Sequence, residues 1–211
     1  MSDTSPIAVV LAAGKGTRMN SDLPKVLHEA AGKTLLAWVL DALSDAGCHD
    51  QIVVIGYGGD SVRTDVGFRP GVQFAVQQKQ QGTGDAVRAA APLIESTNAI
   101  GDCSRPVVIV CGDSPLLRPS SIRSLLEAFQ STGAACLLGT AITKDPTGLG
   151  RIVRDTNKQF ACITEEKDAN ESERLIQEVN MSTYVFAADQ LLWALERINT
   201  GNAAGEYYLT D

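Results

Sequence analysis

Apolar residues fall into short runs of β-branched side chains that alternate with longer segments of helical periodicity. The first two runs, residues 7–11 and 52–55, flank a segment at 34–46 in which leucine and valine recur at helical spacing. Further strands are predicted over residues 72–76, 107–111 and 135–142, and further helices over 83–94 and 119–132. Strands that are continuously apolar and separated by helices predict a mostly parallel sheet with helices on both faces.

The later third of the chain changes character. Two short strands are predicted over residues 150–154 and 160–164, joined by a polar turn, and this pattern predicts a small antiparallel insertion. A strand over residues 179–186 and a helix over 187–198 are expected to follow. Because no linker, repeat or low-complexity segment interrupts the chain, we expect one α/β domain over residues 1–211.

The composition excludes some classes of function. The 211 residues are 44% hydrophobic and 20% charged, with a formal net charge of -7. Since nucleic-acid binding needs Lys and Arg clustered over a broad face, we expect no nucleic-acid partner. No apolar run is long enough to span a bilayer, and the first residues lack the pattern of a signal peptide. We therefore expect no membrane partner and a cytoplasmic location.

Cysteine and histidine give no sign of a metal centre. The five cysteines are widely spaced without a C-x-x-C pair, which favours buried, reduced thiols over disulfides or a zinc site. His28 and His49 have no partner at metal-ligand or triad spacing, so we assign them no catalytic role.

The strongest candidate for chemistry follows the first predicted strand. Residues 11–19 read LAAGKGTRM and residues 23–27 read LPKVL. Small residues let backbone N–H groups approach a phosphate chain closely, and Lys15, Arg18 and Lys25 bring positive charge to it. The spacing matches neither the P-loop nor the dinucleotide-binding fingerprint. A tight glycine turn with surface cations explains the coincidence of these features less well.

A second candidate lies between a predicted strand and the helix that follows it. It consists of Gln77 and the segment QGTGDA at residues 81–86. A carboxamide both donates and accepts hydrogen bonds, so Gln77 suits the edge of a nucleobase, with Gly82 and Thr83 beside it. An ordinary glycine turn with a helix cap accounts for this segment equally well.

A third candidate is the segment CGDSPL at residues 111–116, which follows an apolar strand. A carboxylate at a strand end beside a phosphate loop is a natural ligand of Mg²⁺, which takes one or two carboxylates plus substrate phosphates. Ligands of open α/β sheets bind at the carboxyl ends of the strands. We therefore favour Asp113 as a metal ligand over Asp113 as a turn residue.

Three weaker fragments occupy the later third, at residues 147–153, 165–168 and 178–180. Sugars are usually held by carboxylates, amides and backbone groups, so Glu165 and Asn180 suit hydroxyl or acetamido groups. Taken singly, each fragment is more often a solvated charge or a turn.

Taken in order, these motifs and the segment GEYYLTD resemble the uridyltransferase domain of bacterial N-acetylglucosamine-1-phosphate uridyltransferases over nearly the whole chain. The resemblance implies a Rossmann-like fold, the substrates UTP and N-acetylglucosamine 1-phosphate, and Mg²⁺ as cofactor. In the implied reaction the sugar phosphate attacks the α-phosphorus of UTP, and positioning and charge neutralisation carry the rate. Such a nucleophile needs no general base, which explains why the chain has no histidine dyad or triad.

The resemblance also assigns residues to the site. The phosphates are expected on Arg18 and Lys25, and Mg²⁺ is expected on Asp113. The nucleotide is expected on Leu11, Ala12, Ala13, Gly14, Gln77, Gly82 and Thr83. The sugar is expected on Gly150, Glu165 and Asn180.

The chain departs from the family in three motifs. Cys111 stands where the family often has tyrosine, Asp85 where it has histidine, and Met181 and Ser182 where it has threonine and glycine. The last change leaves two alternatives open: a nucleotidyltransferase for another sugar or small phosphate, and a nucleotide-binding regulatory domain with little turnover. The family usually continues into a segment with a second metal-binding asparagine and then a β-helix acetyltransferase domain, and neither is expected within residues 1–211.

Overall fold

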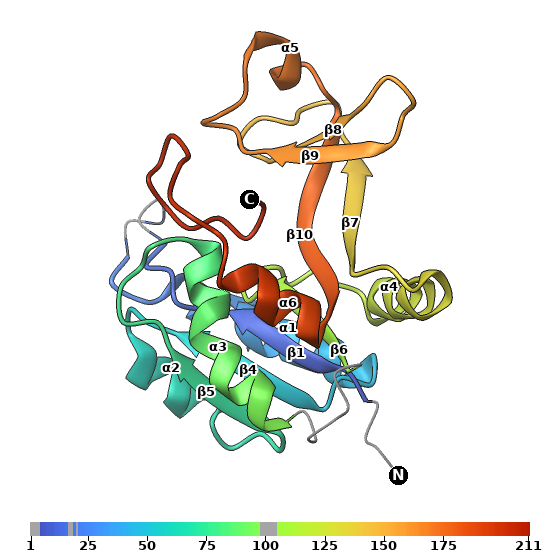
Figure 1. Ribbon diagram of the computed structural model, residues 1–211. Coiled ribbons are helices and arrows are strands. Elements are labelled where there is room, and N and C mark those ends of the chain that lie inside the picture. The colour runs from blue at the N-terminus through green and yellow to red at the C-terminus, as the bar shows by residue number, and fades with distance from the viewer. Residues whose placement is uncertain (1–4, 17–18, 20, 98–104) are drawn as a thin grey trace.

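The central sheet contains eight strands, and the computed structural model describes residues 5–16, 19, 21–97 and 105–211. Strands β5, β4, β1 and β6 lie side by side and run parallel (Figure 1). Strand β10 then pairs antiparallel with β6 and with β7, so the sheet is mixed. The strands are β1 (Ile7–Leu11), β4 (Asp50–Ile55), β5 (Val72–Val76), β6 (Pro106–Cys111), β7 (Cys136–Ile142), β8 (Arg151–Arg154), β9 (Phe160–Thr164) and β10 (Glu178–Ala187).

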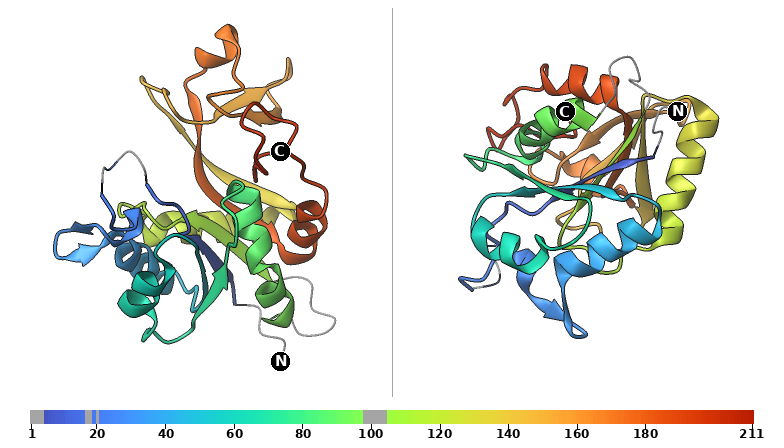
Figure 2. Two further views of the ribbon diagram at one scale, coloured as in Figure 1. Left: turned by 90° about the vertical axis from the view of Figure 1, so that its left-hand side faces the viewer. Right: turned by 90° about the horizontal axis from the view of Figure 1, so that it is seen from below.

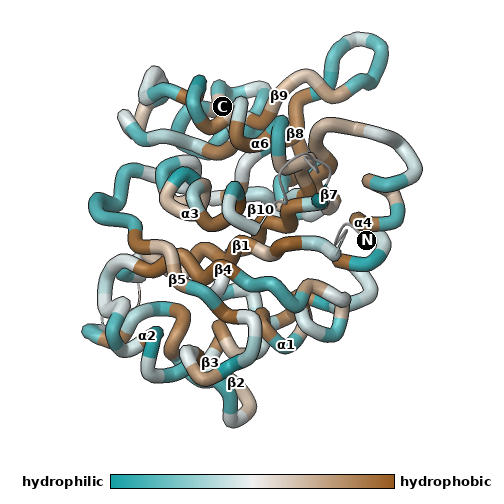
Figure 3. Tube along the Cα trace, turned by 60° about the horizontal axis from the view of Figure 1, so that its bottom comes forward, coloured by the Kyte–Doolittle hydropathy of each residue, from teal (hydrophilic) through white to brown (hydrophobic). Residues whose placement is uncertain are grey.

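Helices cover both faces of this sheet. They are α1 (Leu35–Asp45), α2 (Gly59–Val66), α3 (Thr83–Thr97), α4 (Pro119–Thr132) and α6 (Ala188–Leu195). Along β1, Ala8 and Val10 belong to the core shared with α1, α2 and α4, whereas Ile7 and Val9 belong to the core shared with α3 and α6 (Figure 2). Because both faces are buried, β1 is apolar at every position, and Figure 3 shows β1 and β4 as largely hydrophobic strands inside the fold.

The insertion predicted in the later third is carried on the long strand β10. Strands β8 and β9 pair antiparallel with each other, and Val179 of β10 pairs with Arg151 of β8. A short helix, α5 (Glu171–Arg174), follows β9. Figure 1 shows β8, β9 and α5 standing apart from the helical layers, at the far end of β10. The insertion can therefore present side chains toward the carboxyl edge of the parallel strands.

Every strand and helix expected from the sequence is present, with ends within three residues of those predicted. The α/β class, the helices on both faces and the antiparallel insertion are confirmed. The sequence did not predict α2, α5, the hairpin of β2 (Glu29–Ala30) and β3 (Lys33–Thr34), or the 3-10 helix η2 (Lys25–Leu27).

The described part of the chain contains no helix long and apolar enough to cross a membrane. The cysteines that the structure describes, Cys48, Cys111, Cys136 and Cys162, are free thiols. Within the same residues, no group of three His, Cys, Asp or Glu side chains is placed to hold a metal ion.

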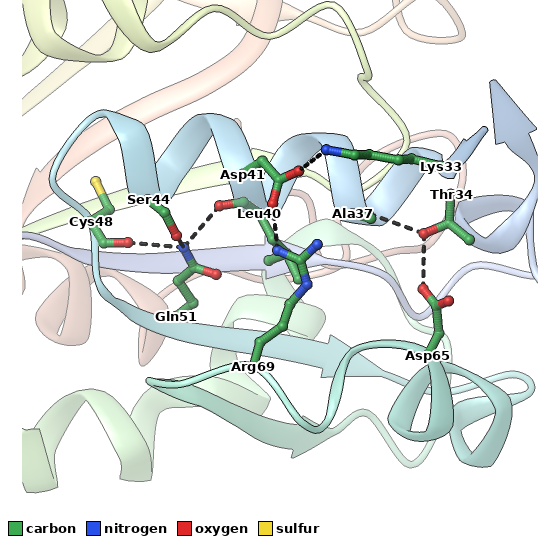
Figure 4. Close-up of polar contacts among 10 residues, drawn as sticks. All are labelled: Lys33, Thr34, Ala37, Leu40, Asp41, Ser44, Cys48, Gln51, Asp65 and Arg69. Atoms are coloured by element: carbon green, nitrogen blue, oxygen red, sulfur yellow. Dashed lines mark hydrogen bonds and ion pairs between the residues drawn. The ribbon is translucent and has the colours of Figure 1, made fainter. Parts of the chain in front are cut away.

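A buried polar contact ties β4 to α1. Gln51 is 2% exposed, and its amide nitrogen donates to the carbonyl oxygens of Leu40 (3.1 Å) and Cys48 (2.9 Å) (Figure 4). The hydroxyl oxygen of Ser44 lies 3.0 Å from the same nitrogen. Buried backbone carbonyls are costly to leave without a donor, so this side chain stabilises the turn between α1 and β4.

We expect Gln51→Leu to lower the free energy of unfolding by about 1–3 kcal/mol, because the buried Cys48 carbonyl loses its donor. Urea denaturation measures the change. Gln190→Leu is the matched control, since Gln190 is exposed on α6 and its amide bonds to the neighbouring Asp189. The control is expected to change stability by less than about 0.5 kcal/mol. An equally small loss in Gln51→Leu would contradict the role of Gln51.

Candidate active site

The loops that follow β1, β5 and β6 meet at one edge of the sheet. Leu11 and Cys111, the last residues of β1 and β6, lie opposite each other, and the Gly112 N–H donates to the Leu11 carbonyl (2.9 Å). In the loop after β5, the Gln80 side chain donates to the Ala13 carbonyl (2.7 Å). This is the carboxyl edge of the parallel strands, where ligands of open α/β sheets bind.

Lys25 and Asp113 form an ion pair that joins two of the predicted motifs. Lys25 opens the 3-10 helix η2, whose Val26 and Leu27 are buried and hold it in place. Gly16 adopts a φ of +67°, and a Cβ there would lie 2.6 Å from the Cβ of Lys25, so the glycine-rich loop packs directly on Lys25. The Lys25 side chain is 44% exposed and that of Asp113 is 26% exposed, so both can reach a phosphate or a cation.

The other two cations of the first motif are Arg18 and Lys15. Arg18, expected on the phosphates, lies outside the described residues. The Lys15 ammonium lies over the ring of Tyr57, 5.0 Å from its centroid, which is a cation–π distance. Lys25 is therefore the cation of this motif that the structure places against the carboxylate of Asp113.

A hollow lies between the glycine-rich loop and the loop after β5. It is lined by Leu11, Ala13, Gly14, Gln77, Gln80, Gly82, Thr83, Ala86 and Glu206. Of the predicted nucleotide-binding residues, Ala12 does not line the hollow; it is buried, and its N–H donates to the Val54 carbonyl (2.9 Å). The Gln77 amide nitrogen donates to Asp85 (2.7 Å) and to the Gly82 carbonyl (3.1 Å), so Asp85 helps to orient Gln77.

Residues 206–211, here called the C-terminal strap, fold back onto the loop after β5. Tyr207 receives a backbone hydrogen bond from Gly84 (2.8 Å) and donates one to Gln81 (2.7 Å). The Leu209 N–H of the strap donates to the Thr83 hydroxyl (3.0 Å). Thr83 was expected to bind the nucleotide, and it also anchors the strap. Figure 1 shows the strap passing between α3 and the insertion.

We expect Gly82→Ala to weaken binding of UTP, the nucleotide that the family resemblance implies, by about 10- to 100-fold. Gly82 has a φ of +112°, and a Cβ there would lie 2.4 Å from the Tyr207 carbonyl oxygen, so the substitution displaces both the strap and the loop. Calorimetric titration with UTP measures the change. Gly133→Ala is the control, because Gly133 also has a positive φ, +62°, yet a Cβ there meets nothing within 4 Å. Equal UTP affinities of the two variants would contradict the prediction.

A cavity of about 270 Å³ continues from the hollow toward the insertion. It is lined by Leu11, Thr83, Cys111, Gly148, Glu165, Glu166, Lys167, Ser182, Tyr184, Tyr208, Leu209 and Thr210. Leu11 and Thr83 line both spaces, so the hollow and the cavity are contiguous. Two ligands, or two halves of one ligand, can therefore lie end to end past the carboxyl ends of β1 and β6.

The structure brings together the three residues predicted to bind a sugar. A Cβ on Gly150 would lie 3.3 Å from both carboxylate oxygens of Glu165, and the Asn180 N–H donates to the Gly150 carbonyl (2.9 Å). Glu165 lines the cavity and accepts a hydrogen bond from Thr210 of the strap (3.0 Å). The Asn180 amide is buried and donates to the Tyr184 hydroxyl (2.6 Å), so here it supports the cavity wall.

Burial sets the charge state of the cavity wall. It raises the pKa of the Glu165 carboxyl, with the hydrogen bond from Thr210 opposing the rise and nearby carboxylates, including Asp168, adding to it. Burial also raises the pKa of the Cys111 thiol to about 11 and that of the Tyr184 phenol to about 12. Both groups are therefore protonated and neutral at pH 7.

Sequence reasoning missed much of the cavity wall. The strap residues Tyr208, Leu209 and Thr210 line the cavity, but the sequence indicated them only as part of the segment GEYYLTD that resembles the family. Two adjacent tyrosines followed by a leucine, in an otherwise polar segment, were the available signal that this segment packs against something. Tyr184 was expected only as part of a strand.

The MobA-like NTP transferase domain family matches residues 8–190, which include the Lys25–Asp113 pair and the loops around it. The chain belongs to this family. Membership in the MobA-like NTP transferase family confirms the nucleotidyltransferase class that the motifs predict.

Curated relatives support the narrower resemblance. The chain is 48% identical to a bifunctional protein GlmU of Heliobacterium modesticaldum and 44% identical to one of Geobacillus thermodenitrificans, each over 204 residues. Each match covers 97% of this chain and 43% of the relative, so the chain spans less than half the length of these proteins. The family resemblance drawn from the motifs is confirmed.

A solved structure supports the fold. The chain is similar to a UDP-glucose pyrophosphorylase complexed with UDP-glucose, with a TM-score of 0.75 and 16% sequence identity. The match covers 98% of this chain and 84% of that one. At this identity the similarity concerns the fold, and it agrees with the Rossmann-like α/β domain that was predicted.

Proposed function

We propose that the chain transfers the uridylyl group of UTP to N-acetylglucosamine 1-phosphate, forming UDP-N-acetylglucosamine and pyrophosphate. The observation that carries the proposal is that the hollow and the cavity adjoin each other at the carboxyl ends of the parallel strands, where Cys111, two residues before Asp113, lines the cavity. The hollow bordered by Gln77 suits a nucleotide, and the cavity bordered by Glu165 suits a sugar. Leu11 and Thr83 line both, where the bond between the two halves of a nucleotide sugar would lie.

The residues of the site suit an in-line displacement. A phosphate oxygen of the sugar 1-phosphate forms a bond to the α-phosphorus of UTP while the bond from that phosphorus to the bridging β-phosphate oxygen breaks, releasing pyrophosphate. Lys25 would neutralise charge that builds on the phosphates, and Gln77 and the Gly82 backbone would orient the base. Because the attacking phosphate is already an anion, the site needs no general base.

The donor set fits a magnesium ion shared with the substrates. Asp113 offers one partly exposed carboxylate at the edge of the site, and Mg²⁺ typically takes one or two carboxylates together with substrate phosphates. We propose that Asp113 holds this ion, which would draw negative charge from the phosphates when bound. Lys25 would then turn from Asp113 toward the phosphates.

Release of pyrophosphate tests the proposal. The chain is incubated with UTP, CTP, dTTP or GTP and with the 1-phosphates of N-acetylglucosamine, glucose, galactose and N-acetylgalactosamine. We expect the pair of UTP and N-acetylglucosamine 1-phosphate to give the highest kcat/KM, by about tenfold or more over the other pairs. A higher value for another sugar would favour a transferase for that sugar. UTP binding without pyrophosphate release from any pair would instead favour a nucleotide-binding domain.

These substrates are soluble intracellular metabolites, and we therefore propose a cytoplasmic location.

A further inference from the structure

Ser182 has an unusual backbone conformation for its residue type. Its φ is +51°, in the left-handed region that non-glycine residues rarely adopt. It lies where the pairing of β10 with β7 shifts register, between Asn180 and Tyr184. The Ser182 N–H donates to the Asn180 side-chain oxygen (3.0 Å), which holds the irregular turn. A glycine would adopt this conformation at lower cost, so the serine side chain stands here at the expense of some backbone strain.

The side chain of Ser182 lies in the wall of the cavity. Ser182 lines the cavity together with Cys111, at the end of β6, and Tyr184, further along β10. In chain order, Tyr184 lies two residues after Ser182 on β10, and β10 pairs with β6, which ends at Cys111. Glu165 and Thr210 line the same cavity and are hydrogen-bonded to each other. The cavity lining therefore combines the charged groups of Glu165, Glu166 and Lys167 with three groups, those of Ser182, Cys111 and Tyr184, that can donate and accept hydrogen bonds.

We propose that Ser182 determines specificity for the sugar half of the product, with its hydroxyl hydrogen-bonded to an uncharged substituent on the sugar ring. The inference rests on the proposed function, and it names the part of the substrate that this wall recognises. An uncharged substituent is favoured over a phosphate because Ser182, Cys111 and Tyr184 carry no positive charge, and because the cavity lining sets two carboxylates, Glu165 and Glu166, against the single ammonium of Lys167. A ring hydroxyl and an acetamido group share the required chemistry.

Two substitutions separate the hydroxyl from the backbone. Ser182→Ala removes the hydroxyl and keeps a Cβ in the left-handed conformation, whereas Ser182→Gly removes both the hydroxyl and the steric cost. Calorimetric titrations with UDP-N-acetylglucosamine, UDP-glucose and UDP measure equilibrium binding without any need for turnover. UDP reports the nucleotide half alone.

We expect both variants to bind UDP-N-acetylglucosamine about tenfold more weakly, and UDP within about twofold of the unmodified chain. We also expect a higher melting temperature for Ser182→Gly than for Ser182→Ala, because only the glycine relieves the backbone. If the affinity for UDP-glucose falls as much as the affinity for UDP-N-acetylglucosamine, the Ser182 hydroxyl bonds to a ring hydroxyl. If only the affinity for UDP-N-acetylglucosamine falls, the Ser182 hydroxyl bonds to the acetamido group. Either pattern supports the proposal.

Thr183→Ala is the matched control. Thr183 is the next residue of β10, and its hydroxyl donates to the Met181 carbonyl (3.3 Å). The Thr183→Ala variant should bind UDP-N-acetylglucosamine, UDP-glucose and UDP with unchanged affinity. Unchanged affinity for both UDP-sugars in both Ser182 variants would overturn the role of Ser182 and leave the proposed function intact, as would equal weakening of UDP and the UDP-sugars. An unmodified chain that binds neither UDP nor a UDP-sugar would contradict the proposed function itself.

Discussion

Lys25→Ala is expected to lower kcat/KM by about 100-fold or more while the chain stays folded. Removing a preorganised group that stabilises charge in the transition state typically costs about 10²- to 10³-fold in rate. Lys25 is placed for that role, because buried Val26 and Leu27 fix its helix and the glycine-rich loop packs on its side chain. Pyrophosphate release at saturating metal measures the effect. The melting temperature should change little, since exposed ion pairs contribute little to stability.

Lys33→Ala is the matched control for this substitution. Lys33 is 48% exposed, close to the 44% of Lys25, and it also pairs with a carboxylate, that of Asp41 (2.7 Å). Figure 4 shows Lys33 of β3 reaching Asp41 of α1, which also pairs with Arg69. Lys33 belongs to β3 and Asp41 to α1, so this pair does not involve the segment that follows β6, whereas Lys25 pairs with Asp113 of that segment. Near-normal turnover in Lys25→Ala, matching that of Lys33→Ala, would end the assignment of Lys25 to the phosphates.

The central sheet was predictable because its apolar pattern is unambiguous. The strands β1, β4 and β6 are buried on both faces, so each reads as a continuous run of valine and isoleucine. Helix α2 was missed because Val62 and Val66 are its buried residues within the sequence GDSVRTDV, too few to establish a helical period. The hairpin of β2 and β3 has two residues in each strand, which is too short for alternation to be visible.

The site was predictable where its residues follow strand ends. Topology brings the ends of parallel strands to one edge, so Asp113 and the glycine-rich loop were expected to be neighbours, and the Lys25–Asp113 contact agrees with this. The strap could not be located from its sequence, because backbone hydrogen bonds between Tyr207 and the loop after β5 fix it. The conformation of Ser182 was likewise invisible, since a left-handed serine depends on the register shift around it.

Asp113→Asn is expected to lower turnover by about 100-fold at millimolar Mg²⁺ and to raise the metal concentration needed for half-maximal activity by about 10- to 100-fold. The amide keeps the size of the carboxylate but loses the negative charge that attracts Mg²⁺. UDP binding in EDTA should be unchanged or tighter, because Lys25 is then free of its ion pair and can meet the phosphates. A metal ligand is expected to show lower metal-dependent turnover without weaker UDP binding in EDTA. A residue that only shapes the loop would lose both turnover and metal-free UDP binding.

Asp41→Asn is the matched control for this substitution. It also removes a carboxylate that pairs with a lysine, Lys33, and this carboxylate pairs with Arg69 as well (2.6 Å). Asp41 lies outside the site. Asp41→Asn should leave the metal dependence of turnover unchanged at a temperature where the variant is folded. Activity of the unmodified chain that survives EDTA would remove the metal from the proposed reaction. An Asp113→Asn variant with unaltered metal dependence would instead place the ion on other groups, and the Lys25–Asp113 pair would then serve only to hold η2 against the end of β6.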